Sequence, residues 1–144
     1  MQLPRALFVL LMLSWATAST ACSPADEQAA LRVAGGQKSW PALHRSFARY
    51  GHCDDGAVAE GFSESVTGTL ANRWRDTPVL ATLGRKDPAF LRFVIHHIDA
   101  TASAERLKRI DHLSSRSCAP SLAKVCTDIH EAAANALQPE SQAR

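Results

Sequence analysis

Apolar residues recur at the spacing of an α-helix from residue 39 onward, and no useful length of the chain alternates with period two. The segment that starts near residue 58 has an apolar residue at every fourth position, and the last segment has the strongest helical periodicity. The main stripes are Leu43, Phe47 and Tyr50; Val58, Phe62, Val66, Leu70 and Trp74; Val79, Leu80 and Leu83; Leu91, Val94, Ile95 and Ile98; Leu107, Ile110 and Leu113; and Leu122, Val125, Cys126 and Ile129. We therefore predict an all-α fold, a compact bundle of five to seven short helices over residues 39–137.

Residues that begin or end helices separate these stripes. Ser39, Asp87 and Ser103 are typical N-cap residues, and a proline directly follows Asp87. Gly51 and Gly84 are placed where helices are expected to end. These signals support short helices joined by short connections.

The two ends of the chain have different compositions. Residues 22–38 are polar and small, and the pair at positions 35 and 36 is Gly-Gly. We expect a flexible, partly ordered lead-in before the helical domain, and a short helix over residues 24–33 is the alternative. Residues 138–144 are polar, and we expect a frayed tail there.

Residues 1–21 have the three parts of a secretion signal. Arg5 is the only charge before a short apolar run, and small residues follow from Ala16 onward. A membrane-spanning helix would need about 20 apolar residues, which is far more than this run contains. Cleavage after Ala18 or after Ala21 is compatible with the small residues, and the second site would make Cys22 the first residue of a bacterial lipoprotein. The sequence thus predicts an exported protein of the bacterial periplasm or cell envelope.

The mature chain is small and almost neutral. Removing residues 1–21 from the 144 leaves 123 residues, enough for one domain with one core. Fifteen Lys and Arg then face 14 Asp and Glu, because Arg5 leaves with the signal. This balance argues against a nucleic-acid partner, and contact with a membrane is expected only if Cys22 carries a lipid.

Four cysteines remain after export, and we interpret them as disulfide partners. They are Cys22, Cys53, Cys118 and Cys126. Their spacing resembles no zinc site, and four cysteines allow three connectivities. The short loop favours Cys118–Cys126, although a helix starting at Pro120 would place Cys126 almost two turns along it. Pairing Cys53 with either of these would instead tie the first half of the domain to the last helix, and Cys22 is left as a bridge, a lipid anchor or an unpaired residue.

Motifs of catalysis and metal binding are incomplete. Ser121 and Lys124 match S-x-x-K, but the other elements of penicillin-binding enzymes are absent. The run from Gly61 to Ser65 begins like a nucleophile elbow but lacks the closing glycine and a preceding strand. His130 and Glu131 begin an H-E-x-x-H pattern that position 134 does not complete. We predict no catalytic residue, no metal ligand and no cofactor.

His97 follows His96 directly, and the two point about 100° apart on a helix. His97 shares a face with Phe90, Phe93 and Val94. We therefore interpret His97 as a partly buried structural residue rather than a metal ligand.

The region from Asp54 to Glu64 holds four acids, Asp54, Asp55, Glu60 and Glu64. Carboxylates at the start of a helix interact favourably with its dipole, so a well-capped, solvated helix is the first interpretation. The alternatives are an interaction surface for a basic partner and a weak calcium site, although the spacing of an EF-hand is absent. Gly56 and Gly61 within this helix favour close packing contacts, because each helical glycine is retained at a cost of about 1 kcal/mol relative to alanine.

The run Cys53-Asp54-Asp55-Gly56-Ala57-Val58-Ala59-Glu60-Gly61-Phe62-Ser63-Glu64-Ser65-Val66, with Trp74 and the later pair Cys118 and Cys126, resembles a family of small exported bacterial proteins without an assigned activity. The resemblance covers roughly residues 40–135 and implies export and a helical fold. In size, compartment and disulfide use the chain also looks like the small all-α periplasmic immunity proteins that neutralise antibacterial toxins.

These features favour a non-enzymatic envelope protein that binds another protein, as an immunity protein or an inhibitor. One alternative is a small cell-wall hydrolase that uses Glu60 and Glu64. A second alternative is a lipid-anchored structural protein attached through Cys22.

Overall fold

A computed structural model describes residues 21–138 of the chain, and this part contains seven α-helices and no strand. The helices are α1 (Pro24–Ala34), α2 (Trp40–Tyr50), α3 (Gly56–Asn72), α4 (Thr77–Lys86), α5 (Pro88–His96), α6 (Ala104–Arg116) and α7 (Ala123–Ala136). Short 3₁₀ turns, η1 (Gly51–Cys53), η2 (Trp74–Asp76) and η3 (Pro120–Leu122), precede α3, α4 and α7. The prediction of an all-α bundle of short helices is confirmed.

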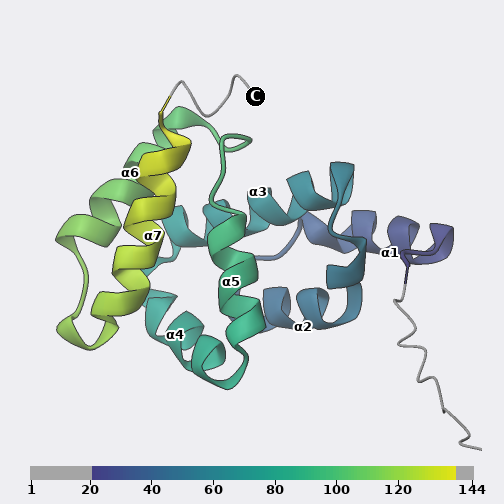
Figure 1. The fold of residues 1–144 in the computed structure, drawn as a ribbon, viewed down its shortest axis with the longest axis horizontal. Coiled ribbons are helices and arrows are strands. Elements are labelled where there is room, and N and C mark those ends of the chain that lie inside the picture. The colour runs from purple at the N-terminus through teal and green to yellow at the C-terminus, as the bar shows by residue number, and fades with distance from the viewer. Residues whose placement is uncertain (1–20, 139–144) are drawn as a thin grey trace, which may run out of the picture.

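Helix α3 passes through the middle of the molecule, with α1 and α2 toward one end and α6 and α7 toward the other (Figure 1). Its predicted stripe is buried, since Val58, Phe62, Val66 and Leu70 are each at most 1% exposed. Trp74 does not continue this helix. It lies in η2, where its indole Nε1 donates a hydrogen bond to the carbonyl of Ser117.

The caps follow the local chemistry of the sequence. The carboxylate of Asp87 accepts hydrogen bonds from the backbone N–H groups of Ala89 and Phe90 at the start of α5. The hydroxyl of Ser103 accepts from the N–H of Arg106 at the start of α6. These bonds satisfy N–H groups that have no partner within their own helix.

Helix α4 differs from the expectation at Gly84. We expected the helix to end there, but it continues to Lys86. A Cβ at Gly84 would lie 2.9 Å from the Cβ of Leu91, so the missing side chain lets α4 and α5 approach closely. The glycine therefore serves interhelical packing instead of ending the helix.

The segment 22–38 also differs from the expected flexible lead-in, because residues 24–34 form helix α1. Ala30 and Ala34 are at most 1% exposed and pack toward α3. A Cβ at Gly61 of α3 would lie 2.9 Å from the Cβ of Ala34, so Gly61 creates the space that α1 occupies. The expected close contact is thus present at Gly61 but not at Gly56, where an added Cβ would meet no atom within 4 Å and the backbone φ is +49°. The alternative of a short helix over residues 24–33 is therefore the one that the structure contains; the sequence signal for it was weak because its buried face consists of alanines.

The cysteines form two disulfides, Cys22–Cys53 and Cys118–Cys126. The second is the pairing that the short loop favoured, and its Cα atoms are 6.2 Å apart. It fits because Pro120 begins a 3₁₀ turn and α7 starts only at Ala123, which places Cys126 in the first turn of α7. In the Cys22–Cys53 disulfide, Cys22 forms a bridge, which was one of the three alternatives for this residue. The bond fixes the start of α1 beside η1, with 4.9 Å between the two Cα atoms.

Two structural disulfides are typical of an oxidising, exported environment. Among the described residues, no helix combines the length and the apolar character needed to cross a membrane. The predicted secretion signal lies outside the described residues apart from Ala21. The predicted frayed tail also lies outside them apart from Gln138.

Candidate functional site

A chain of four polar side chains runs through the centre of the molecule. Asp54 lies between η1 and α3, Ser63 lies in the middle of α3, His97 is the C-cap residue of α5, and Asp99 lies in the following loop. Ser63 and His97 are 2% and 1% exposed, so the middle of this chain is almost fully removed from solvent. We call these four residues the buried polar chain.

Three short contacts connect the buried polar chain. Nε2 of His97 lies 3.0 Å from Oδ2 of Asp54, and Nδ1 of His97 lies 2.9 Å from Oγ of Ser63. The hydroxyl of Ser63 donates to Oδ2 of Asp99 at 2.7 Å. The ring of His97 also packs edge-on against Phe93, with 4.3 Å between ring centroids.

The donors and acceptors in the buried polar chain decide the direction of its contacts. A serine hydroxyl has a single proton, and Ser63 gives it to Asp99, so Ser63 accepts from Nδ1 of His97. Nε2 of His97 faces the carboxylate of Asp54, whose oxygens accept hydrogen bonds. His97 thus contacts one carboxylate directly and reaches the second, that of Asp99, through the hydroxyl of Ser63.

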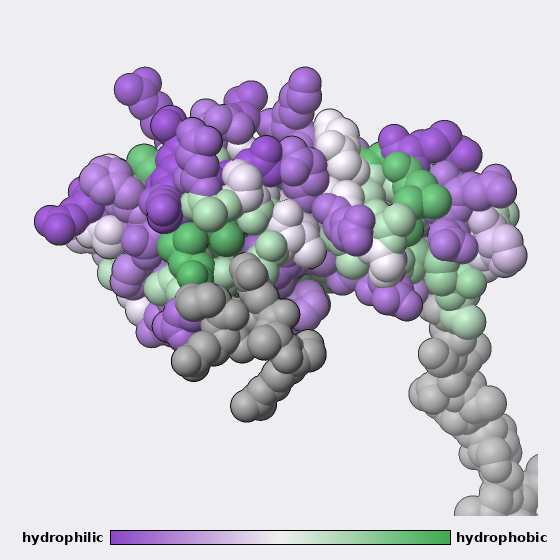
Figure 2. All heavy atoms as spheres, turned by 90° about the horizontal axis from the view of Figure 1, so that it is seen from above, coloured by the Kyte–Doolittle hydropathy of each residue, from purple (hydrophilic) through white to green (hydrophobic). Residues whose placement is uncertain are grey.

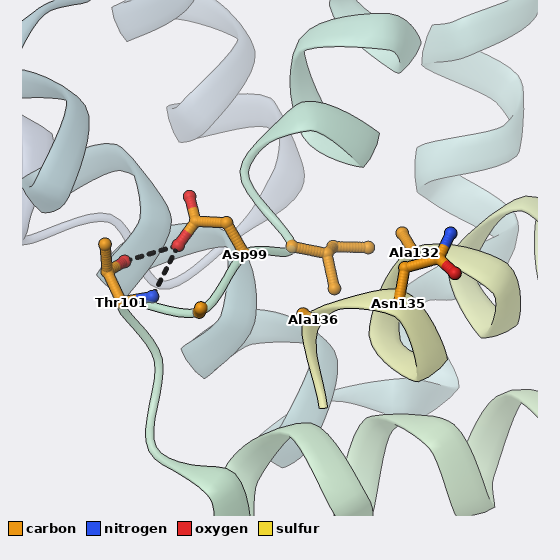
Figure 3. Close-up of a pocket in the computed structure, with 7 residues that line it drawn as sticks. Asp99, Thr101, Ala132, Asn135 and Ala136 are labelled. Atoms are coloured by element: carbon orange, nitrogen blue, oxygen red, sulfur yellow. Dashed lines mark hydrogen bonds between the residues drawn. The ribbon is translucent and has the colours of Figure 1, made fainter. Parts of the chain in front are cut away.

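Asp99 ends the buried polar chain at a shallow pocket. Its Oδ1 accepts hydrogen bonds from the backbone N–H and the hydroxyl of Thr101 (Figure 3). Burial raises the pKa of Asp99, but the hydrogen bonds from Thr101 and Ser63 and the nearby His97 together outweigh it, and the net pKa lies below the ordinary value. Asp99 is thus held as a carboxylate at neutral pH.

The buried polar chain contains the residue types of a nucleophilic triad, but its geometry does not suit that chemistry. The proton of Ser63 points to Asp99 rather than to the histidine that would act as base. The hydroxyl oxygen is also enclosed by the core, so a substrate carbonyl has no approach to it. The buried polar chain instead links α3, the end of α5 and Asp54 to one another. The position of His97 agrees with its interpretation as a structural residue.

The surface has a groove between α5 and α7 of about 620 Å³. We call it the α5–α7 groove, and it is lined by Pro88, Leu91, Arg92, Ile95, His96, Lys124, Asp128, Glu131, Ala132 and Asn135. Its apolar side chains pack against the core, and its charged side chains surround them.

A shallow pocket of about 700 Å³ adjoins the α5–α7 groove, because Ala132 and Asn135 line both. In Figure 3, the loop with Asp99 and Thr101 faces Ala132, Asn135 and Ala136 of α7 across this pocket. Figure 2 shows a mostly hydrophilic face that two hydrophobic areas interrupt, one of them toward the α6 and α7 side. The two hollows together form an extended concave surface along α7.

The four predicted surface acids are not one patch in the structure. Asp54 turns inward to His97, and Asp55 caps α3 by accepting from the N–H of Gly56. Glu64 pairs with Arg106 of α6, and hydrogen bonding from that guanidinium lowers the pKa of Glu64. Glu60 is exposed. The acids that the sequence groups together therefore have four different environments.

No group of three or more His, Cys, Asp or Glu side chains within residues 21–138 is arranged to hold a metal ion. Four of the six histidines instead each lie beside a single carboxylate. His44 lies 2.9 Å from Asp87, and His130 lies 2.8 Å from Asp111.

Sequence reasoning missed the partners of His97. Its shared face with Phe90 and Phe93 indicated burial, and a buried histidine requires polar partners. Nothing local identified Ser63 or Asp54 as those partners, because they lie 34 and 43 residues away along the chain. The α5–α7 groove was missed for the same reason.

No protein-family model matches the chain, and no curated protein or solved structure is significantly similar to it. The family resemblance noted from the sequence therefore stays an expectation. The function has to be inferred from the geometry of the molecule itself.

Proposed function

We propose that this protein acts in the bacterial periplasm or envelope by binding another protein, and that it is not an enzyme. The observation that carries the proposal is the α5–α7 groove with its adjoining pocket. Leu91, Ile95 and Ala132 supply apolar contact area, and Arg92 and Glu131 supply charges at the border. Apolar centres with polar borders are typical of protein interfaces.

The shape of the α5–α7 groove favours a helical segment of the partner. A groove between two helices accepts an amphipathic helix, which places apolar side chains on the floor at steps of three and four residues. Charges of both signs border the groove, so the partner helix should have both acidic and basic residues beside its apolar stripe.

The enclosed state of the buried polar chain supports a non-enzymatic role. Ser63 and His97 have no access to a substrate, and Ser63 gives its proton to Asp99. The hydrolase alternative gains no support, because Glu64 lines a pocket whose lining does not include Glu60. Two carboxylates that act on one glycosidic bond must face the same cleft.

The lipid-anchored alternative is opposed by the first disulfide. A sulfur that is bonded to Cys53 cannot also form a thioether with a lipid. Mass spectrometry of the mature protein should therefore find Cys22 unlipidated and linked to Cys53. A diacylglyceryl adduct on Cys22 would restore the anchored alternative.

Site-specific crosslinking tests the binding surface. A photoreactive amino acid replaces His96, which is exposed and borders the groove, and in a control it replaces Val79, which is 41% exposed on α4. Irradiation in the periplasm should give a defined protein adduct at position 96 and none at position 79. The adduct should diminish when Arg92→Glu reverses a charge at the groove border. Equal adducts at both positions, or none at either, would reject the groove as the binding surface.

The immunity version of this proposal has its own test. A toxin gene should lie beside the gene for this chain, and co-expression of this protein should protect cells from that toxin. If no toxin gene lies beside this gene, or if co-expression gives no protection, the protein is not an immunity protein. The proposal that the groove binds a protein is then still judged by the crosslinking result.

A further inference from the structure

A second, smaller hollow lies on another part of the surface, between the α1–α2 connection, α3 and α6. Its volume is about 260 Å³, and we call it the polar pocket. It is lined by Gly35, Gln37, Lys38, Glu64, Ser65, Gly68, Thr69, Asn72, Arg73 and Arg106. Neither the buried polar chain nor the α5–α7 groove shares a residue with this lining.

Hydrogen bonds hold one wall of the polar pocket in place. The hydroxyl of Ser65 donates to the carbonyl of Ala34 and accepts from the N–H of Gln37 at 3.1 Å. The side-chain amide of Gln37 donates to the carbonyl of Val33 at 2.8 Å. Ser65 of α3 therefore holds both the end of α1 at Ala34 and the connection that carries Lys38 at Gln37.

The lining of the polar pocket has excess positive charge. Lys38, Arg73 and Arg106 face one acid, Glu64. Arg106 donates from Nη1 to Glu64 and, at 3.3 Å, to Thr67. Arg73 donates from Nε to Asp76 at 2.7 Å, which fixes the guanidinium. Only one of the three cations is paired with an acid of the lining itself.

The floor of the polar pocket has both space and a polar group without a partner. A Cβ added at Gly68 would meet no atom within 4 Å. The neighbouring Thr69 is 3% exposed, and its hydroxyl has no hydrogen-bond partner among the described residues. Buried hydroxyls are normally hydrogen-bonded, and a rotation of the Thr69 side chain toward a ligand would break no existing hydrogen bond of this hydroxyl.

From these observations we propose that the polar pocket binds a small molecule through an oxyanion, either a carboxylate or a phosphate group. Guanidinium and ammonium groups recognise both anions, and the volume admits a small metabolite rather than a macromolecule. This site is separate from the proposed protein-binding groove and does not depend on it.

Nuclear magnetic resonance titration with inorganic phosphate and with citrate tests the polar pocket. The amide signals of Gly68, Thr69 and Lys38 should shift and saturate, and the affinity should fall as sodium chloride is added. Shifts with phosphate alone identify a phosphate site, and shifts with citrate alone identify a carboxylate site.

Matched variants decide whether the binding is specific. Gly68→Leu fills the floor and Arg73→Gln removes a lining charge, and each should weaken binding about tenfold or more. Ala57→Leu on an exposed position of α3 and Arg75→Gln outside the lining should change affinity by no more than about twofold.

Two results would overturn the proposal. One is the absence of saturable shifts at these amides with either anion at millimolar concentration. The other is an equal loss of affinity in Arg73→Gln and Arg75→Gln, which would indicate general surface attraction. Neither result would affect the crosslinking test of the α5–α7 groove.

Discussion

Ser63 and His97 are 34 residues apart in the chain, and their side chains meet at 2.9 Å in the core, between Oγ and Nδ1. Each also contacts a carboxylate, Asp99 for Ser63 and Asp54 for His97. A serine and a histidine that hydrogen-bond in this way can suggest catalysis. Here their enclosure and the direction of the serine proton make them a link between helices.

Replacing His97 should strongly destabilise the fold. His97→Ala leaves Oδ2 of Asp54 without its partner, leaves Ser63 bonded to Asp99 alone, and opens a cavity beside Phe93. We expect the free energy of unfolding to fall by about 3 kcal/mol. Urea unfolding of His97→Ala measures it, and His96→Ala is the control.

His96 is exposed, so its replacement should change the free energy of unfolding by less than about 0.5 kcal/mol. Similar values for the two variants would mean that the buried polar chain contributes little to stability.

The two disulfides should contribute unequally. The Cys22–Cys53 bond joins residues 31 apart, and the Cys118–Cys126 bond joins residues 8 apart. Because a longer closed loop restricts the unfolded chain more, the Cys22→Ala/Cys53→Ala variant should lose about 4 kcal/mol and the Cys118→Ala/Cys126→Ala variant about 2.5 kcal/mol.

Chemical denaturation compares the two disulfide variants, and hydrogen exchange locates the effect. Without the first bond, amides of α1 near Ala30 should exchange faster than those of α7. If amides of α1 exchange more slowly than those of α7 in this variant, packing on α3 alone is enough to hold α1 in place.

Two glycines of α3 should respond oppositely to alanine. Gly61→Ala places a Cβ 2.9 Å from that of Ala34 and 3.0 Å from the backbone nitrogen of Gly35, so α1 must shift. Although alanine is the better helix former, we expect a net loss of about 1–3 kcal/mol in the free energy of unfolding. Thermal and urea unfolding give the value.

Gly68→Ala is the matched control, since its Cβ meets no atom within 4 Å. It should leave the stability unchanged or raise it by up to about 1 kcal/mol. A stabilised Gly61→Ala protein would contradict the close contact between α1 and α3.

The carboxylate of Asp99 should contribute to the acid sensitivity of the protein. Its pKa lies below the ordinary 3.8 in the folded state, so its stabilising contribution is complete above pH 3.8 and is lost as the pH falls through the lower, folded-state pKa. Thr101→Val removes a hydroxyl donor to Asp99 and should raise this pKa toward the ordinary value.

Carboxyl carbon resonances of Asp99 followed by pH titration measure the change. Thr82→Val, at an exposed threonine of α4 whose hydroxyl bonds its own helix, is the control and should leave the Asp99 titration unchanged. An unchanged pKa in Thr101→Val would remove Thr101 as a cause of the shift.

The sequence by itself determined the helices from α2 onward, because the signals that specify them are local. A stripe such as that from Val58 to Leu70 and a cap such as Asp87 act within a few residues of one another. The signal-like residues 1–21 and the four cysteines likewise predicted export and disulfides without reference to the fold. Helix α1 was obscured because its buried residues, Ala30 and Ala34, are too small to mark a strong apolar face.

The tertiary structure alone decided the partner of Cys22, the buried polar chain and the two proposed binding surfaces. Each depends on residues that are distant in the chain, such as Asp54 with His97 and Glu64 with Arg106. Periodicity reports which face of a helix is apolar, but not which helix covers that face. The long-range packing of α3 against its neighbours therefore settles which polar groups meet in the core and which hollows remain at the surface.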